Sequence, residues 1–372
     1  MHNSKAILRE VRVNGPMSRI DLATRLQMSK STVSGIVAEL IEKELITETG
    51  SMQSQGGRRA IRLQFNQAYG CVLGIDIGLF WMRFAVADLN GHIQIQTKRR
   101  MPSGRNGSRV LCALQDAIRE LIDEFQLSEL SVLSVCVSAP GNVREDGTLV
   151  NASAIPHLEG LPLKEQLSEL FPSALIVIEN DVNVAAFAEN WNGCGSRYRT
   201  FVYVGIGSGL GCGLVLNSQL FRGALGAAGE VGLLSMGLGD GPTIEEDLSS
   251  SGILRTFKRY RNNDGHVTSV KAAFEVILRE PDAHEEFIQW LVVRLAYVIR
   301  ILCGVLNPEA VILGGGIGRR MDFLLPNVMK ALNIAIPSPI VEVSSLGDDI
   351  QLVGAVGIAL NEVSDLLVEL RG

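Results

Sequence analysis

Three clusters of glycine follow strand-like apolar segments, and turns of this kind can hold phosphate groups. The clusters lie at Gly74–Gly78, Gly205–Gly213 and Gly314–Gly316. Backbone N–H groups in such turns can approach a phosphate closely, because no side chain intervenes. Each cluster alone is a weak signal, since glycine also makes hairpin turns. Together, the turns around 78 and 207 could form a cradle for the phosphates of a nucleotide.

A second set of reactive side chains lies near the N-terminus and has the chemistry of DNA contact. Small hydroxyl groups and one ammonium group open a segment with helical periodicity. Such groups can contact DNA phosphates and base edges, and the helix dipole favours phosphate at this end. We therefore expect DNA contacts from Ser29, Lys30, Ser31, Thr32 and Ser34.

The elements that would position this set are three short helices and a hairpin. Ser18 and Ser29 have the residue type and position of helix N-caps, and the third helix is predicted from about residue 30 to 43. Strand-like runs at 45–49 and 60–65 flank a glycine-rich tip that carries Arg58 and Arg59, which suits a DNA backbone or minor-groove contact. Residues 1–65 thus predict a winged helix-turn-helix, with a small protein-binding helical domain as the alternative.

Length and charge agree with a small basic head on a larger acidic body. The chain has 372 residues and 47% hydrophobic residues, too many for one core and too apolar for a disordered chain. Residues 1–65 hold 10 Lys or Arg and 6 Asp or Glu, a net charge of +4. Because the whole chain has a net charge of −6, the remaining residues carry a net charge of −10. Only the head is therefore expected to meet a polyanion.

Cysteine usage and hydropathy bear on the compartment. The six cysteines are scattered without a Cys-x-x-Cys pair, which favours a reducing cytoplasm over a disulfide framework. The N-terminus lacks an apolar signal core. Arg294 and Arg300 interrupt the longest apolar helix candidate, 287–306, so we expect no membrane span. The expected location is the cytoplasm, in association with the nucleoid.

From residue 71 onward, strands and helices alternate in a pattern typical of an α/β body. Apolar strands are predicted at 71–78, 83–88, 92–97, 133–138, 175–178, 200–204 and 311–316, with long helices at 110–125 and 287–306. The strand at 175–178 ends at Glu179-Asn180-Asp181, a position where cleft residues collect.

Several of these stretches together resemble the ROK (repressor, ORF, kinase) family. The matching segments are Gly74-Ile-Asp-Ile-Gly78, Ala139-Pro-Gly141, Glu179-Asn-Asp-Val-Asn183, Gly207-Ser-Gly-Leu-Gly-Cys-Gly213, Gly229-Glu230 and Leu313-Gly-Gly-Gly316. With the N-terminal head, the chain is similar to the repressor branch. The resemblance implies a two-lobed, actin-like or hexokinase-like (ribonuclease H-like) body, with a sugar cleft between the lobes, and a homodimer or homotetramer. We expect lobes at 71–180 plus 354–372 and at 181–353, the second with the oligomerisation surface.

The resemblance also assigns roles to individual residues. Asp181 stands where the family has its catalytic Asp, and Asn180 beside it would bond a sugar hydroxyl. For Asp181 a helix-capping role is the alternative, and for the acidic pair near 246 the alternative is a solvated helix start. The implied sugar-binding set is His157, Asn180, Asp181, Glu230, Glu246 and Asp247.

Three departures from the family pattern weigh against catalysis and metal binding. Leu79-Phe80 replace the Gly-Thr of the first phosphate loop, which blocks backbone approach and removes a hydroxyl. No Cys lies between Cys212 and Cys303, and Leu233 stands where a His is expected, so we predict no structural zinc. His157 replaces an Asn before the Leu-x-Gly turn, which indicates an altered sugar pocket.

The sequence therefore favours a DNA-binding regulator over an enzyme. The leading hypothesis is a sugar-responsive regulator, a repressor of carbohydrate-metabolism genes, that binds double-stranded operator DNA. A sugar or sugar phosphate in the cleft would change the angle between the lobes and so reposition the paired DNA-binding heads. The alternatives are an active ATP-dependent sugar kinase with a DNA-binding head, and a regulator controlled by a protein partner with a vestigial cleft. No catalytic residue, cofactor or membrane contact is assigned.

Overall fold

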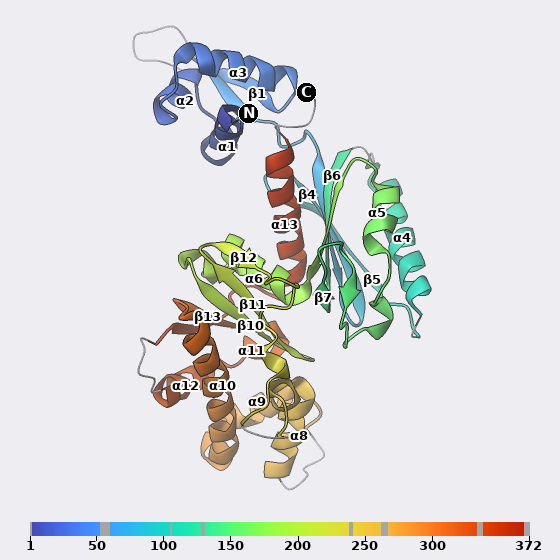
Figure 1. The fold of residues 1–372 in the computed structure, drawn as a ribbon, viewed down its shortest axis with the longest axis vertical. Coiled ribbons are helices and arrows are strands. Elements are labelled where there is room, and N and C mark those ends of the chain that lie inside the picture. Colours follow the sequence, from blue (N-terminus) through green and yellow to red (C-terminus); the bar gives the residue numbers. More distant parts are fainter. Residues whose placement is uncertain are drawn as a thin grey trace.

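The molecule consists of a small N-terminal domain and a body of two lobes. The structure is a computed structural model that describes residues 2–52, 60–104, 106–127, 131–237, 241–261, 267–332 and 338–367. The N-terminal domain lies at one end, and the helices of the second lobe lie at the other (Figure 1). The predicted contacts of Arg58 and Arg59 fall outside the described residues.

The N-terminal domain has the predicted three helices and hairpin. Helices α1 (His2–Asn14), α2 (Arg19–Arg25) and α3 (Lys30–Glu42) are followed by the antiparallel strands β1 (Ile46–Met52) and β2 (Ala60–Phe65). Ser18 caps α2 in a capping box with Asp21, and the Ser29 side chain caps α3 by accepting the N–H of Thr32. Both predicted N-caps are confirmed, because this signal depends only on neighbouring residues.

The first lobe is a five-stranded mixed sheet covered on both faces. Its strands are β3 (Cys71–Ile77), β4 (Trp81–Asp88), β5 (Ile93–Arg100), β6 (Val132–Ala139) and β9 (Leu175–Asn180), in the order β5-β4-β3-β6-β9. Helices α4 (Gly107–Glu124) and α5 (Leu163–Leu170) pack on Leu73 and Ile75, whereas Val72 on the opposite face belongs to the cluster of α13 (Ile350–Leu366). A short hairpin, β7 (Asn142–Val143) and β8 (Leu149–Val150), lies beside β9.

The second lobe repeats this topology. Its strands are β10 (Phe201–Ile206), β11 (Leu210–Leu216), β12 (Gln219–Phe221), β13 (Ala310–Gly314) and β14 (Ile340–Val343), in the order β12-β11-β10-β13-β14. In both sheets the first three strands are antiparallel, and the last two run parallel to the first. The repeated order defines the two-lobed, actin-like body that the sequence predicts.

Helices cover both faces of the second sheet. Helix α6 (Asp181–Asn192) packs on the face that carries Phe201 and Tyr203. The opposite face, which carries Val202 and Val204, is covered by a larger helical layer. That layer includes α7 (Ile244–Leu248), α8 (Ser250–Tyr260), α9 (Val270–Arg279), α10 (Glu285–Leu306) and α12 (Leu325–Leu332), while α11 (Gly315–Gly318) directly follows β13.

The sequence predicts no membrane span, and helix α10 is the helix on which this expectation depends. The helical stretch Pro281–Leu306 is long and apolar enough to cross a membrane by length and composition. In the structure its inner face packs in the core of the second lobe through Leu291, Leu295 and Leu302. Arg300 donates from Nε to the carbonyl of Leu332 at 3.0 Å. The packing therefore accounts for α10 as the core helix of a globular lobe.

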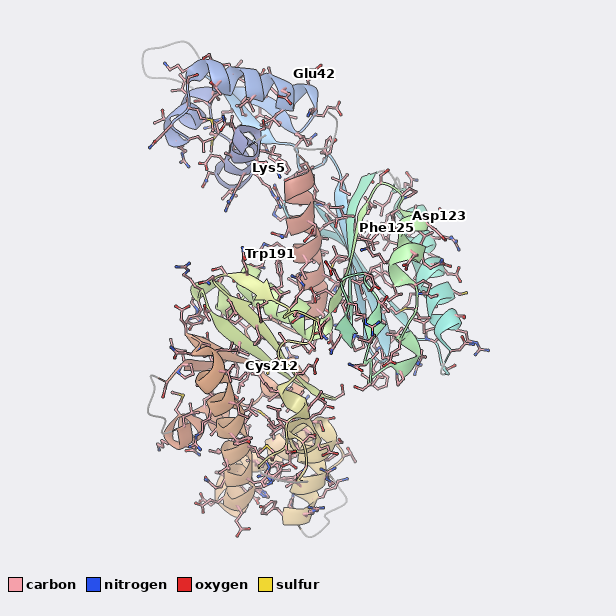
Figure 2. All side chains as sticks on the ribbon, viewed as in Figure 1. Lys5, Glu42, Asp123, Phe125, Trp191 and Cys212 are labelled. Carbon is pink, nitrogen blue, oxygen red and sulfur yellow. The ribbon has the colours of Figure 1, made fainter. Side chains whose placement is uncertain are left out.

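Helix α13 joins the three parts of the chain. It packs on β3 of the first lobe and on α6, which belongs to the second-lobe sheet (Figure 1). A Cβ atom on Gly354 would lie 2.2 Å from the carbonyl oxygen of Val184, and one on Gly357 would lie 2.5 Å from the indole of Trp191. Figure 2 shows Trp191 beside α13. One buried cluster connects α13 residues such as Leu360 with the core of the N-terminal domain. Because α13 is continuous, the expected lobe boundary at 353–354 falls inside it.

We expect Gly354→Ala to destabilise the body, because its methyl group would collide with the backbone of α6. Overpacking of this kind costs about 1–3 kcal/mol, and urea unfolding followed by circular dichroism measures it. Gly304→Ala is the matched control: Gly304 also lies in a helix, but a Cβ there meets no atom within 4 Å. The control should gain up to about 1 kcal/mol from helix propensity. Equal stabilities of the two variants would contradict the close approach.

Candidate functional site

A cavity of about 680 Å³ is lined by residues of both lobes. The first lobe contributes Pro140–Asn142, Asn151, Ser153 and Ala154, next to the β7–β8 hairpin. The second lobe contributes the glycine-rich turn between β10 and β11 and the start of α11. A cavity of this volume accommodates a sugar or a larger metabolite.

Two of the three predicted glycine turns line this cavity. Gly207 and Gly316 would leave an added Cβ without any atom within 4 Å, so their backbone is open to a ligand. Gly315 has φ +75°, which favours glycine, and its N–H donates to the Tyr203 hydroxyl at 2.9 Å. The turn at Gly78 is not among the described residues that line the cavity. Among the described residues, the cavity lining brings 205–211 together with Gly315 and Gly316.

Asn180 and Asp181 lie where β9 meets α6 and open into the cavity. The Asn180 side chain is the N-cap of α6: its Oδ1 accepts the N–H groups of Val182 and Asn183 at 2.9 and 3.0 Å. Its Nδ2 donates to the carbonyl of Gly141 at 2.9 Å, which ties the first-lobe loop to α6. The capping role that the sequence suggested for Asp181 thus belongs to Asn180, and Asp181 is the first residue of the helix.

The cavity collects carboxylates whose charges disfavour one another. Burial, together with the negative charges of Asp76 and Glu230, raises the pKa of Asp181 to about 6. Burial and the charge of Glu245 raise the pKa of Glu230. Asp181, Glu230 and Glu245 line the cavity, and each can accept hydrogen bonds from hydroxyl groups. An uncharged ligand rich in hydroxyl groups fits such a surface better than an anion does.

The acidic segment at α7 contributes a different residue from the two that the sequence suggests. Glu245 lines the cavity and accepts the N–H of Leu210 at 2.8 Å. Glu246 instead forms a capping box with Thr243, and Asp247 forms an ion pair with Arg294 at 2.6 Å. A helix of this pitch turns neighbouring residues to different sides. The one-residue uncertainty in the family pattern is the reason that Glu245 was missed.

His157 is also placed away from the cavity lining. It lies in the 3-10 turn Pro156–Leu158, and both ring nitrogens are buried without a hydrogen-bond partner among the described residues. Two residues further along, Glu159 lines the cavity and accepts the N–H of Ala152 at 2.7 Å. Of the predicted sugar-binding residues, the cavity therefore brings together Asn180, Asp181 and Glu230.

The positions that distinguish this chain from the family's kinases and zinc proteins are apolar. Leu79 and Phe80 occupy the turn between β3 and β4, and 70% of the Phe80 surface is exposed. Leu233 lines the cavity and is 67% exposed. Among the described residues no group of three His, Cys, Asp or Glu side chains could hold a metal ion. The expected absence of structural zinc stays a prediction, which depends on the lack of any Cys between Cys212 and Cys303.

The N-terminal helix α3 presents a small, polar surface. Lys30, Ser31, Thr32 and Ser34 are exposed, as are Gly35 and Ala38, while Val33, Val37 and Leu40 are buried. The Ser29 hydroxyl caps the helix and lies 2.8 Å from the hydroxyls of both Ser31 and Thr32. Small side chains allow a helix to approach the major groove closely.

Fold and surface together define a winged-helix protein with a sugar-kinase-like body. Residues 2–55 match the MarR family, whose winged helix the N-terminal domain shares, and residues 72–362 match the ROK family. The chain belongs to the ROK family, in the branch that carries an N-terminal DNA-binding head.

Relatives and solved structures agree over most of the chain. The xylose repressor of Bacillus subtilis (strain 168) is 26% identical over 98% of this chain and 96% of its own length. The DNA-binding transcriptional dual regulator NagC of Escherichia coli (strain K12) is 25% identical over 89% of this chain and 84% of its own. A ROK family transcriptional regulator, described as a homologue of the E. coli MLC protein, superposes with a TM-score of 0.83 at 24% identity over 99% of this chain and 97% of its own. A ROK family glucokinase from Streptomyces griseus superposes with a TM-score of 0.65 at 24% identity, over 78% of this chain and 100% of its own.

The raised pKa of Asp181, about 6 in the folded chain, predicts a pH-dependent effect of Asp181→Asn. An unfolded Asp titrates near pH 3.9, so the folded chain binds the extra proton between about pH 4 and 6. Stability is therefore lost as the pH rises through this window. We expect Asp181→Asn to raise the free energy of unfolding by on the order of 1 kcal/mol at about pH 8, and to have no such effect near pH 4.

Urea unfolding of both chains at the two pH values measures this difference. Asp282→Asn, at an exposed position, controls for the loss of one negative charge. A gain from Asp181→Asn that is the same at both pH values would contradict the assignment.

Proposed function

We propose that this chain is a sugar-responsive DNA-binding regulator that represses genes of carbohydrate metabolism. The observation that carries the proposal is that one chain has both an exposed, polar α3 surface and a carboxylate-lined cavity between two lobes. Full-length relatives that are named as a xylose repressor and as the regulator NagC support the same function. Such a protein works in the cytoplasm, where its DNA lies.

In this proposal α3 reads the major groove of operator DNA. Lys30 neutralises a phosphate at the helix N-terminus, and the exposed hydroxyls of Ser31 and Ser34 contact base edges. Two chains would place two such helices on neighbouring half-sites, so the proposal includes a homodimer or a pair of dimers.

The effector of this proposal is a neutral sugar held by Asp181, Glu230 and Glu245. A ligand that contacts both lobes favours one angle between them over another. Helix α13 packs against both the first lobe and the core of the N-terminal domain, so the angle is transmitted to the DNA-binding heads. This requires that the sugar bind the two states with different affinity.

The proposal includes neither phosphoryl transfer nor structural zinc. A kinase needs loops that hold ATP and Mg²⁺, and the β3–β4 turn offers the exposed side chains of Leu79 and Phe80 instead of a Gly-Thr pair. Asp181, a carboxylate at the position of a base, is the observation that favours the kinase alternative. ADP release over a panel of sugars that is lost in Asp181→Asn would establish that alternative. Elemental analysis of the purified chain tests the zinc statement.

Lys30→Ala should weaken binding to the DNA upstream of the chain's own gene, because one phosphate contact is lost. The slope of log affinity against log salt concentration should fall in magnitude by about 1, which fluorescence anisotropy over a salt series measures. Lys330→Ala, an exposed lysine in α12 of the second lobe, removes the same charge far from α3 and should leave the slope unchanged. An unchanged slope in Lys30→Ala would remove Lys30 from the DNA surface.

One sugar of a panel should release the wild-type chain from this DNA. Asp181→Asn and Glu230→Gln should keep their DNA affinity but require at least about tenfold more sugar, since each removes a charged acceptor worth roughly 1.5–3 kcal/mol. Lowering the pH below about 6 should also weaken the sugar response, because Asp181 becomes protonated. DNA binding that no sugar changes would favour control by a protein partner instead.

A further inference from the structure

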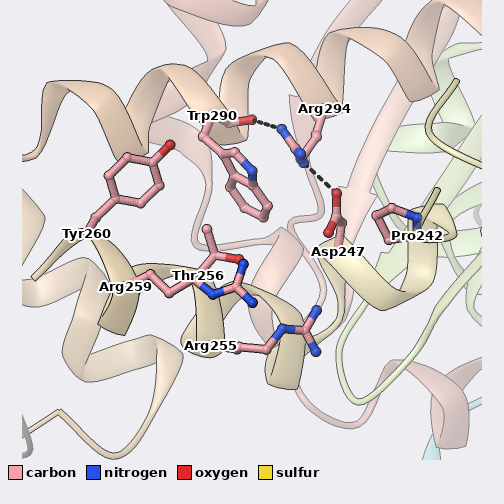
Figure 3. A pocket seen from close by; sticks show the side chains of 8 residues that line it. All are labelled: Pro242, Asp247, Arg255, Thr256, Arg259, Tyr260, Trp290 and Arg294. Carbon is pink, nitrogen blue, oxygen red and sulfur yellow. Dashed lines mark hydrogen bonds and ion pairs between the residues drawn. The ribbon is translucent and has the colours of Figure 1, made fainter. Parts of the chain in front are cut away.

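A second cavity lies in the helical layer of the second lobe, and the proposed function does not use it. It has a volume of about 530 Å³ and lies between α7, α8 and α10 (Figure 3). This volume is within the range of small-molecule sites. The described residues that line it are Pro242, Asp247, Arg255, Thr256, Arg259, Tyr260, Trp290 and Arg294, and we call it the arginine cavity.

The charges of the arginine cavity do not cancel. Asp247 neutralises Arg294 at an N···O distance of 2.6 Å. Within the described parts of the chain, the Arg255 guanidinium donates to the backbone carbonyl of Glu246 at 2.9 Å, and the Arg259 side chain has no ion pair or hydrogen bond. Arg255 and Arg259 are both exposed and lie one turn apart on α8. Among the described residues, no carboxylate is paired with the guanidinium group of Arg255 or Arg259.

An aromatic wall stands opposite these arginines. The indole of Trp290 points into the cavity between the Arg294–Asp247 pair and Arg259, and Tyr260 stands at its edge (Figure 3). The Arg294 guanidinium lies 4.0 Å from the centre of the indole, which holds both groups in place. Tyr260 is 42% exposed, and its ring lies edge-to-face with that of Phe287, with the ring centres 5.9 Å apart. Cationic groups beside an aromatic wall suit a ligand with a charged end and a less polar body.

The position of the arginine cavity separates it from both surfaces of the proposed function. Figure 1 shows α8 and α10 at the end of the molecule opposite α3, so the arginines lie far from the proposed DNA surface. Helix α7 separates the two cavities: Glu245 lines the interlobe cavity, and Asp247 lines the arginine cavity. The interlobe cavity is rich in carboxylates, whereas the arginine cavity is cationic, so an anion is favoured only in the arginine cavity.

We propose that the arginine cavity binds the phosphate monoester of a small metabolite. The phosphate lies between Arg255 and Arg259, and the body of the metabolite rests against Trp290 and Tyr260. A phosphate monoester carries a charge of about −1.5 to −2 at neutral pH, which matches the two unpaired guanidinium groups. Arginine also presents a planar pair of donors that fits two phosphate oxygens at once.

Calorimetric titration of the full chain with inorganic phosphate and with glucose 6-phosphate tests this site. Arg255→Gln and Arg259→Gln should each raise the Kd for both probes at least about tenfold. Arg279→Gln is the matched control, because it removes the same charge at an exposed position in the last turn of α9. Glucose 6-phosphate should bind more tightly than inorganic phosphate, and Trp290→Leu should abolish that difference.

Asp181→Asn separates this proposal from the function proposed for the interlobe cavity. Glucose 6-phosphate binding that survives Asp181→Asn but is lost in Arg259→Gln supports the arginine cavity. Binding lost in Asp181→Asn and kept in Arg259→Gln places the ester between the lobes and overturns the proposal, while the sugar-responsive function stands. Absence of binding by either probe at millimolar concentration overturns it as well. Equal affinity for the two probes overturns the assignment of the metabolite body to Trp290.

Discussion

The close crossing of α13 and α6 is the constraint on which the rest of this structure depends. The two helices can approach only because Gly354 and Gly357 lack side chains at the points where Val184 and Trp191 lie against α13. Helix α13 also covers the first-lobe sheet, and its buried face continues into the core of the N-terminal domain. Lobes, cavity and DNA-binding head therefore meet along one helix. Closely packed helices shift as discrete units and do not deform continuously. A change in the angle between the lobes, as the proposed function requires, would therefore involve this crossing.

The interlobe cavity combines features of a sugar site with only part of a phosphate site. Carboxylates from three segments, Asp181, Glu230 and Glu245, face a space that the glycine turns of the second lobe border. The turn that would complete a phosphate cradle from the first lobe carries Leu79 and Phe80. In the proposed function, hydroxyl recognition is retained and no step requires phosphoryl transfer. Three arginines lie elsewhere, around Trp290 in the second lobe, so the two proposals give a neutral and an anionic ligand separate cavities.

Local signals allowed much of the fold to be predicted from the sequence. Ser18 and Ser29 cap the helices that they precede, and the strands at β3, β6 and β13 lie where apolar runs end in small residues. These signals involve residues close in sequence, so no tertiary information is needed. The site was predicted less completely. Asn180, Asp181 and Glu230 line the cavity, whereas Glu246, Asp247 and His157 do not, and Glu245 was missed. A shift of one residue on a helix moves a side chain to another face, and a short motif does not fix that register.

The sequence by itself determined the division of this protein into a basic winged-helix head and an acidic α/β body, because charge, periodicity and capping are properties of neighbouring residues. It also determined that no Cys lies between Cys212 and Cys303, on which the prediction of no structural zinc depends. Tertiary structure alone decided which glycine turns face each other, which acid of α7 enters the cavity, and that Arg255, Arg259 and Trp290 surround a common space. These relations join residues far apart in the chain, and only the packing of helices against two sheets fixes the distances between them.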